Sequence, residues 1–477
     1  MVDGTVALSV LALTLGLFAL VGLRSRNAAS DLEDFVVARG SQGARALGLS
    51  FLASGMGAWI LFAPPQVGAL VGLIAVIGYA LGAAAPLLAF ALLGRRMRRI
   101  APAGHSLAEF IRVRFGRAFH AYVVGISILY MLVFVTAELS AIGGIAALLS
   151  GVRPVIAILA VALVTLAYTA YGGLRATIRT DRWQGWLLIG LLTGAALVIL
   201  PSADASLSSL DATGLLEVRA IGVEAGITLI IAVTAANLFH QGYWQRVWAA
   251  RDDRALARGA AIGAALTLPI VLLVGVIGIV AAGAGAELGQ PSVPFFALMT
   301  GLPAWLSVVV LALGVCLVAS SVDTLENGLA ALVAAERPSM SLAAARWATA
   351  ALLVPAVVVA LQGFDVLRLF LIADLLCAAT VVPALLGLWA RASSGGALAG
   401  AISGLAGALI GGWISTGALV DGALAATFPD NTPTLWPFVG AIVASATVSV
   451  VVSLIGGARE DLGEISARIP QLSRAAR

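Results

Sequence analysis

Long apolar segments alternate with short polar links along almost the whole chain. A helix needs roughly 20 apolar residues to cross the hydrocarbon core of a bilayer, and the pattern predicts about thirteen such spans. They are expected at about 6–23, 46–71, 74–94, 118–149, 154–172, 183–201, 224–241, 259–285, 304–333, 342–361, 364–390, 394–416 and 436–458. The hydrophobic pattern therefore predicts an all-α polytopic membrane protein.

Two polar, glycine-containing stretches, 54–59 and 237–242, interrupt these spans at corresponding places in two halves of the chain. An unsatisfied backbone group in hydrocarbon costs several kcal/mol, so a helix can break at mid-depth only where the freed groups line a buried cavity. Broken helices of this kind hold ions and substrates in transporters. The two interruptions therefore indicate a transporter.

Each interruption falls in the first span of a group of five, so the chain divides into two repeats. Because five is odd, the second repeat would enter the membrane from the opposite side, as in inverted-repeat, alternating-access transporters. The tail mixes basic and aliphatic residues and would form either a surface-lying amphipathic helix or a solvated segment. The predicted organisation is an N-terminal span and cytoplasmic link (1–45), a first five-helix repeat (46–201), an extracellular loop (202–223), a second five-helix repeat (224–390), two additional spans (391–458) and a cytoplasmic tail (459–477).

Composition and charge agree with a membrane protein. Hydrophobic residues make up 61% of the chain and charged residues 11%, which excludes a soluble globular protein. The isoelectric point near 9.5 would by itself suggest a nucleic-acid partner, but the positive charge is all arginine and falls mainly in every second link, with only Arg153, Arg219 and Arg368 on the other side. One such link carries Arg246, Arg251, Arg254 and Arg258. The positive-inside rule then places the N-terminus outside and the C-terminus in the cytoplasm, in the cell inner (plasma) membrane. We expect the lipid bilayer, and no nucleic acid, as the partner of this surface.

The first span and the cysteines have simple interpretations. The first span has no basic residue before its apolar core and no small-residue cleavage pattern after it, so we expect it to be retained. Cys316 and Cys377 lie inside predicted spans without metal-type spacing and are expected to pack as apolar residues. The sequence therefore predicts neither a cleaved leader nor a cysteine metal site.

Adjacent hydroxyl side chains at Ser320 and Ser321 lie inside an apolar span. Na⁺ is a hard cation that prefers oxygen ligands, and an unwound, buried helix supplies carbonyl oxygens without adding charge. Serines in membrane helices commonly bond a neighbouring carbonyl or helix instead. A broken helix combined with a hydroxyl pair favours a sodium site over that alternative.

Acidic residues also lie inside the predicted spans, where insertion scales assign roughly 2.5–3.5 kcal/mol to an acid at a helix centre. Glu138 is a candidate for contact with substrate, and a structural hydrogen bond to a neighbouring helix is the alternative; the same two interpretations apply to Asp374. Asp323, Thr324 and Glu326 continue the helix that carries the serine pair. Some favourable interaction has to offset the insertion of these acids.

The segment 171–184, YGGLRATIRTDRWQ, resembles the signature between the fourth and fifth core helices of the sodium/solute symporter family. Residues 54–61 resemble the unwound first core helix of its proline-carrier branch. Residues 243–246 (YWQR) resemble the end of the sixth core helix in urea-type members, and 318–321 (VASS) the hydroxyl pair of the eighth. The resemblance covers essentially the whole chain and implies a LeuT-type inverted repeat with broken first and sixth core helices.

The resemblance also implies ligands for the coupling ion, Na⁺. They would be the backbone carbonyls of Ala53 and Met56 on the first core helix and of Leu317 on the eighth, together with the hydroxyls of Ser320 and Ser321. These five residues form the predicted sodium site.

Some relatives are thought to hold a second sodium nearby, at positions that correspond here to Asp181, Asp323 and Thr324. Asp323 is an acid where the family often has a hydroxyl, so we expect either a second cation or an exchanged proton at this place. For Asp181 the alternative is a helix cap or a pair with an arginine. Proline carriers also have an acid at the position of Gly55, and its absence here weakens a proline assignment.

Four residues are predicted to contact the substrate: Glu138, Trp59, His240 and Tyr243. His240 could hydrogen-bond the substrate or carry a proton near neutral pH, although a buried histidine is more often satisfied by backbone. Trp59, Tyr243 and Trp244 would supply flat apolar walls, although aromatic residues in spans usually only pack. We expect no functional role for His105 in its cytoplasmic link.

The predicted function is sodium-coupled import of a small polar organic solute by alternating access. Urea or another small amide or amine is favoured weakly by 243–245. Proton coupling through Glu138, Asp323 or His240 is the alternative mechanism, and a sensor module with a separate signalling partner is a further one. An enzyme is not expected, because the chain has no HExxH or GxSxG motif.

Overall fold

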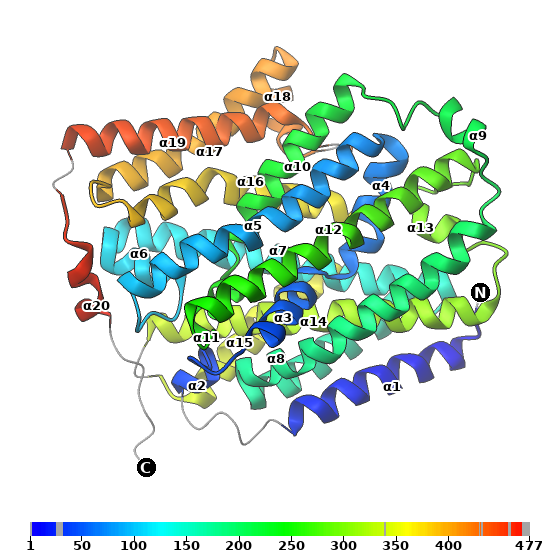
Figure 1. The fold of residues 1–477 in the computed structure, drawn as a ribbon, viewed down its shortest axis with the longest axis horizontal. Coiled ribbons are helices and arrows are strands. Elements are labelled where there is room, and N and C mark those ends of the chain that lie inside the picture. The colour runs from blue at the N-terminus through cyan, green and yellow to red at the C-terminus, as the bar shows by residue number, and fades with distance from the viewer. Residues whose placement is uncertain are drawn as a thin grey trace.

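The computed structural model describes residues 2–24, 32–337, 340–428, 430, 433–456 and 459–469. Within these residues the chain is built from helices and forms no β-sheet. The long helices lie lengthwise beside one another in a single bundle (Figure 1). The expectation of an all-α membrane protein is confirmed.

Eleven helices in the described part are long and apolar enough to cross a membrane, and a bent pair raises the number to twelve. The helix α8 (Pro154–Ser202) has 49 residues, enough to cross twice at 1.5 Å per residue. It is interrupted at Gly173, whose φ of 56° and ψ of −154° are not helical and favour glycine. Counting α8 as two spans gives the predicted number.

The other long helices agree with the predicted spans to within a few residues. They are α1 (Gly4–Leu23), α5 (Leu73–Ile100), α7 (Arg117–Ser150), α10 (Ala220–Phe239), α12 (Asp253–Gly283), α14 (Ala304–Glu336), α15 (Leu342–Ala360), α16 (Val366–Leu385), α17 (Ser394–Thr416) and α19 (Leu435–Gly456). The bent pair is α3 (Ala44–Gly55) with η1 (Ala58–Leu61) and α4 (Ala63–Leu70).

The stretch 173–182, which we expected to be a link, is helical apart from Gly173. Its two faces explain the difference. Thr177, Thr180 and Asp181 are buried, whereas Arg179 and Arg182 are exposed. The polar side chains on the inner face have partners inside the protein, so this segment stays within the bundle. Its backbone groups then satisfy their hydrogen bonds by continuing the helix. Asp181 therefore lies inside a helix and does not cap one.

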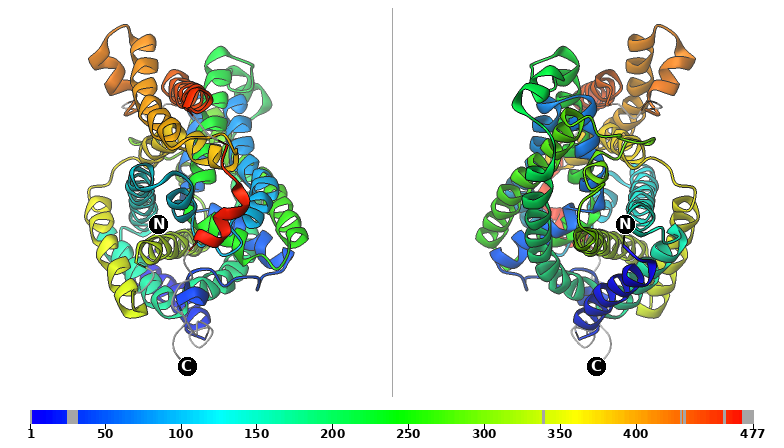
Figure 2. Two further views of the ribbon diagram at one scale, coloured as in Figure 1. Left: turned by 90° about the vertical axis from the view of Figure 1, so that its left-hand side faces the viewer. Right: turned by 90° about the vertical axis from the view of Figure 1, so that its right-hand side faces the viewer.

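The helices α17 and α19 follow the two repeats and pack closely on each other along small residues. A Cβ added to Gly407 would lie 2.2 Å from the carbonyl oxygen of Gly440, so the two backbones touch. In Figure 2 this pair lies at the top of the molecule in both views, and α1 lies in its lower half. The pair is peripheral to the two broken helices.

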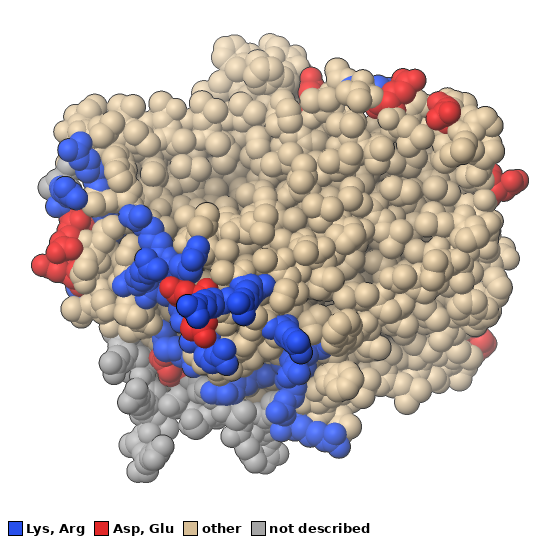
Figure 3. Space-filling view, in the orientation of Figure 1, with Lys and Arg blue, Asp and Glu red and all other residues tan. Residues whose placement is uncertain are grey.

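Charged residues are distributed unevenly over the surface. In Figure 3 the basic side chains gather at the lower left with some acidic ones among them, other acidic side chains lie along the upper and right edges, and the area between is uncharged. The basic end contains the start of α3, the end of α5 and the start of α12 (Figure 1). We call this the arginine-rich end; it is the end predicted to face the cytoplasm.

The described part of the tail is short and docked. It contains η3 (Leu462–Glu464) and α20 (Ile465–Arg468), with Ile465 fully buried. Arg114 in α6 (Leu107–Phe115) forms an ion pair with Glu460. Neither a long surface helix nor a fully solvated segment describes residues 459–469, and 470–477 lie outside the described residues.

Candidate ion and substrate site

Both predicted helix breaks are present. The helix α3 ends at Gly55, and Met56 (φ −102°, ψ 84°) and Gly57 (φ −82°, ψ −177°) are not helical before η1 begins. The α3 and η1–α4 segments are bent by 58°. The second break is at His240 (φ −64°, ψ 115°), between α10 and α11 (Gln241–Ala249).

The first break leaves carbonyl groups free. Within the described residues, no backbone N–H is bonded to the carbonyl of Ala53 or Met56, while the Gly55 carbonyl accepts a hydrogen bond from Trp59 Nε1 at 3.1 Å. Ala53 and Met56 are both buried. Two of the predicted sodium ligands therefore have the unpaired oxygen that a cation site requires.

Glu138 of α7 reaches the first break. Its Oε2 accepts a hydrogen bond from the Ala58 N–H at 2.8 Å. Its Oε1 is buried without a hydrogen-bond partner of good geometry, and the Ser321 hydroxyl lies beside the same carboxyl group. Glu138 thus joins the broken helix to the predicted sodium ligand Ser321.

Ser320 faces a different acid, Asp181 of α8. The Ser320 hydroxyl donates to Asp181 Oδ1 at 2.8 Å, and Ser54 donates to Oδ2 at 3.3 Å. A donating hydroxyl keeps its lone pairs for a cation. Leu317 is buried one turn earlier in α14. The adjacent serines therefore connect the predicted sodium site to two buried acids.

Asp181 is paired with Arg246, which we expected in a cytoplasmic link. The Nη2 atom of Arg246 lies 2.8 Å from Asp181 Oδ2, and neither side chain is exposed. Arg246 also donates to the Ser50 hydroxyl at 2.7 Å, to the Gly242 carbonyl at 2.8 Å and to Thr324 Oγ1 at 3.0 Å. Arg246 lies in the buried α11. Its flanking tryptophans in the sequence WQRVW were the available signal for burial.

The other acids of this region have hydroxyl partners. Tyr168 donates a hydrogen bond to Asp323 Oδ2 at 2.7 Å, and Thr180 donates one to the same oxygen at 3.3 Å. Thr165 donates to Glu326 Oε1 at 3.0 Å. Neither acid has a direct basic partner among the described side chains. The residues predicted to bind a second cation thus lie close together. The positive group among them is the guanidinium of Arg246, which belongs to the chain itself.

Aromatic rings connect the two breaks. Trp59 lies 6.2 Å from Phe370, Phe370 lies 4.3 Å from Phe134, Phe134 lies 6.0 Å from His240, and His240 lies 5.0 Å from Tyr243, measured between ring centroids. We call these five rings the aromatic cluster. All four residues predicted to contact substrate are in this cluster or, for Glu138, one helical turn from Phe134.

Sequence reasoning missed Tyr130, Phe134 and Phe370. The signal was a spacing of four residues on α7, which puts Tyr130, Phe134 and Glu138 on one face. The Tyr130 hydroxyl is buried without a hydrogen-bond partner. Asp374, one turn after Phe370 on α16, is also buried. The cluster is therefore flanked by two acids and an unpaired hydroxyl.

The imidazole of His240 is engaged by its own helix. Its Nδ1 accepts a hydrogen bond from the Gly242 N–H at 3.0 Å, which caps α11. Trp244 points elsewhere: its Nε1 donates to the Leu238 carbonyl at 2.8 Å, and its ring packs on Phe90 and Trp248. The His240 side chain therefore stabilises the helix break, and Trp244 packs outside the aromatic cluster.

A cavity of about 480 Å³ opens at the end opposite the arginine-rich end. Phe62, Gln66 and Ser140 line it together with the connections 289–293 and 361–366. Phe62 directly follows η1. The cavity therefore leads from this end of the bundle toward the first break.

At the arginine-rich end, His105 lies between two carboxylates. Its Nδ1 is 2.9 Å from Glu109 and its Nε2 is 2.5 Å from Glu33, a geometry that favours a protonated ring donating from both nitrogens. Burial alone would lower the pKa of His105, but the two carboxylates raise it above 6.5. Burial would raise the pKa of Glu33, but His105 and Arg39 lower it to about 2. We had expected no role for His105.

The sequence of the chain is similar to those of known solute transporters. The model of the sodium:solute symporter family matches residues 35–404. The spermidine transporter DUR31 of Candida albicans (strain SC5314 / ATCC MYA-2876) is 31% identical over 75% of this chain and 70% of its own length. The urea active transporter of Saccharomyces cerevisiae (strain ATCC 204508 / S288c) is 24% identical over 28% of this chain and 18% of its own.

Two solved structures share the fold. A Na⁺-coupled sialic acid symporter in a substrate-bound outward-open state gives a TM-score of 0.76 at 17% identity, and the match covers 95% of this chain and 99% of that one. Mhp1, a nucleobase-cation-symport-1 family transporter, gives a TM-score of 0.57 at 15% identity, and the match covers 92% of this chain and 96% of that one. The likeness in fold extends over almost the whole chain.

Proposed function

Because the chain belongs to the sodium:solute symporter family, we propose that it is a sodium-coupled symporter that imports a small polar organic solute by alternating access. It is a solute transporter and not an enzyme. The observation that carries the proposal is the first helix break. There, free carbonyls of Ala53 and Met56 lie on the same broken helix that Glu138 joins to Ser321.

The proposed sodium site consists of Ala53, Met56, Leu317, Ser320 and Ser321. A membrane potential of 100 mV contributes roughly 2.3 kcal/mol per charge moved inward, which corresponds to well over tenfold accumulation. One sodium is thus enough for useful uptake. With the arginine-rich end in the cytoplasm, the N-terminus would be outside and the C-terminus inside.

Within this function, we propose that the solute is a small amine carried as a cation. The aromatic cluster has two buried acids beside it, Glu138 and Asp374, and neither has a basic partner among the described side chains. Aromatic faces attract cations, and a cationic solute would offset the acids in the low-dielectric interior. The relation to a spermidine transporter supports the same class of solute.

Transport by the purified protein in proteoliposomes tests the proposal. An inward sodium gradient should drive uptake of a mono- or polyamine, with urea, amino acids and monocarboxylates as alternative solutes. Sodium-driven urea uptake without amine uptake would contradict the cationic class but not the sodium coupling. Uptake driven by a pH gradient without sodium would contradict the sodium site.

Proton coupling is the second candidate, and one observation favours it. Asp323 and Glu326 are one turn apart on α14, both are fully buried, and their direct partners are hydroxyl groups. An intramembrane acid without a basic partner is a candidate proton carrier. The proteoliposome experiment with a pH gradient separates this function from the first.

A further inference from the structure

A cavity of about 880 Å³ is hollowed into the surface between α3, α8 and α12. We call it the lateral groove. Its lining contains three arginines, two tryptophans and three aliphatic residues: Arg45, Leu49, Arg179, Arg182, Trp183, Trp186, Ile262 and Leu266. The groove is separate from the aromatic cluster and from the predicted sodium ligands.

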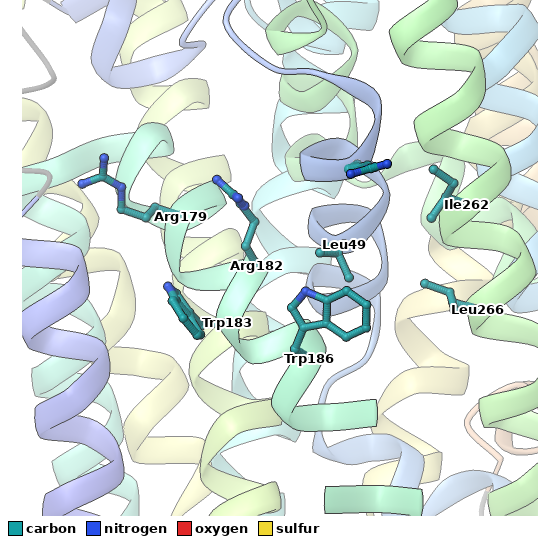
Figure 4. Close-up of a pocket in the computed structure, with 8 residues that line it drawn as sticks. Leu49, Arg179, Arg182, Trp183, Trp186, Ile262 and Leu266 are labelled. Carbon is teal, nitrogen blue, oxygen red and sulfur yellow. The ribbon is translucent and has the colours of Figure 1, made fainter. Parts of the chain in front are cut away.

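The lining changes from charged to apolar along the groove. Figure 4 shows the side chains of Arg179 and Arg182 at one level and those of Trp183 and Trp186 at the next along α8. On α3, Arg45 precedes Leu49 by one turn, and α3 and the part of α8 after Gly173 both run inward from the arginine-rich end. The charged rim is therefore at the membrane surface and the apolar wall is deeper.

Both tryptophans face outward. Trp183 is 60% and Trp186 is 63% exposed, whereas Gln184 and Gly185 between them are buried. Exposed tryptophans in membrane proteins gather at the level of the lipid headgroups, where an amphipathic ring is best accommodated. The lateral groove thus has the two features of a lipid site, a basic rim and an interfacial aromatic wall.

We propose that the lateral groove binds one anionic phospholipid from the leaflet at the arginine-rich end. Arg45 and Arg182 hold the phosphate, and the acyl chains lie along the tryptophans and the aliphatic wall. Arg45 and Arg182 are exposed and have no acidic partner among the described side chains. A basic pocket between membrane helices is complementary to an anionic headgroup, and the apolar wall distinguishes a lipid from a soluble phosphate.

The groove adjoins the buried Asp181 network. Leu49 precedes Ser50, Arg182 follows Asp181, and the Ser50 hydroxyl donates to Asp181 Oδ2 on the inner side. A Cβ added to Gly185 would lie 3.4 Å from the Leu49 carbonyl oxygen, so α3 and α8 are in close contact here. A lipid held by Arg45 and Arg182 links these two helices from outside. We therefore expect bound lipid to stabilise the α3–α8 contact, whatever the transported solute is.

Lipid binding to the purified full chain tests the inference. Phosphatidylglycerol and phosphatidylcholine are titrated separately into delipidated protein in neutral detergent, with bound lipid counted by native mass spectrometry. Phosphatidylglycerol should bind, and the variant Arg45→Gln/Arg182→Gln should bind it about twenty-five-fold more weakly, since each basic group near a charged headgroup contributes roughly a factor of five. The matched control is Arg24→Gln, an exposed arginine at the end of α1 outside the groove, which should bind as wild type does.

Equal binding of the two lipids, or unchanged binding by the double variant, would overturn the inference. So would displacement of the lipid by glycerol phosphate, which lacks acyl chains. A second variant covers the case in which the double variant does not fold. Brominated phosphatidylglycerol should quench wild-type tryptophan fluorescence more than brominated phosphatidylcholine, and this difference should vanish in Trp183→Phe/Trp186→Phe; a persisting difference places the lipid elsewhere.

Discussion

Arg246 and Asp181 form an ion pair of 2.8 Å with no exposure of either side chain. Breaking a buried pair on one side leaves an uncompensated charge and typically costs about 3–5 kcal/mol. We therefore expect Arg246→Gln and Asp181→Asn each to lower the thermal midpoint strongly. The double variant Arg246→Gln/Asp181→Asn should regain much of the loss, because it leaves neither member of the pair as an uncompensated charge. Single variants as stable as wild type would contradict this.

The same pair predicts how sodium activates transport. A guanidinium fixed to the chain fills the position considered for a second cation, so we expect one coupling sodium and a Hill coefficient of about 1. Ser321→Ala should weaken sodium activation about tenfold or more, since a polar contact to an ion contributes about 1.5–3 kcal/mol. The measurement is initial uptake against sodium concentration. A coefficient near two, reduced to one by Asp323→Ala, would instead support a second sodium site.

Glu138→Gln removes a negative charge beside the aromatic cluster but keeps a side chain that can accept from the Ala58 N–H. If the solute is a cation, its apparent affinity should fall at least about thirtyfold, because losing one partner of a buried charge pair costs about 2–5 kcal/mol. Uptake across a range of solute concentrations measures this. Glu224→Gln, an exposed acid on α10, is the control. An equal affinity for a cationic solute in Glu138→Gln and wild type would argue against the amine assignment.

Gly57, in the first break, has the Glu138 carboxyl group in the space that a side chain would occupy. A Cβ at this position would lie 1.7 Å from Glu138 Oε1 and 2.3 Å from its Cδ. Gly57→Ala should therefore displace the carboxyl group from Ala58 and abolish uptake. Gly190→Ala is the matched control, because nothing lies within 4 Å of its Cβ position and alanine is favoured in a helix by up to about 1 kcal/mol. Normal transport by Gly57→Ala would show that this contact is dispensable.

The contacts of His105 predict how stability depends on pH. The raised pKa of His105 means that its contribution is complete below pH 6.5 and is lost as the pH rises through the folded-state value. The lowered pKa of Glu33, about 2, means that its contribution is present above pH 4.5 and is lost as the pH falls toward 2. Thermal midpoints should therefore decline on both sides of this window. His105→Gln should flatten the alkaline side and Glu33→Gln the acid side; unchanged profiles would refute the assignment.

Local sequence properties determined the spans and the breaks. Membrane thickness fixes the length of an apolar helix, so hydropathy alone located the long helices to within a few residues. The stretches 54–59 and 237–242 were recognisable because polar and glycine residues rarely interrupt a span without a purpose. The same reasoning misjudged 173–182, because arginines on one face of a helix resemble those of a polar link until the buried face is known.

The partners of the buried charges were decided only by the tertiary structure. Asp181 and Arg246 are separated by 65 positions in the chain, and Glu138 and Ala58 by 80. The packing of α3, α7, α8, α11 and α14 decides these partners. It determines which buried acid pairs with an arginine and which one faces the aromatic cluster. Hydropathy reports the preference of each residue for lipid or water, but it carries no information about which residue on another helix will satisfy a buried charge.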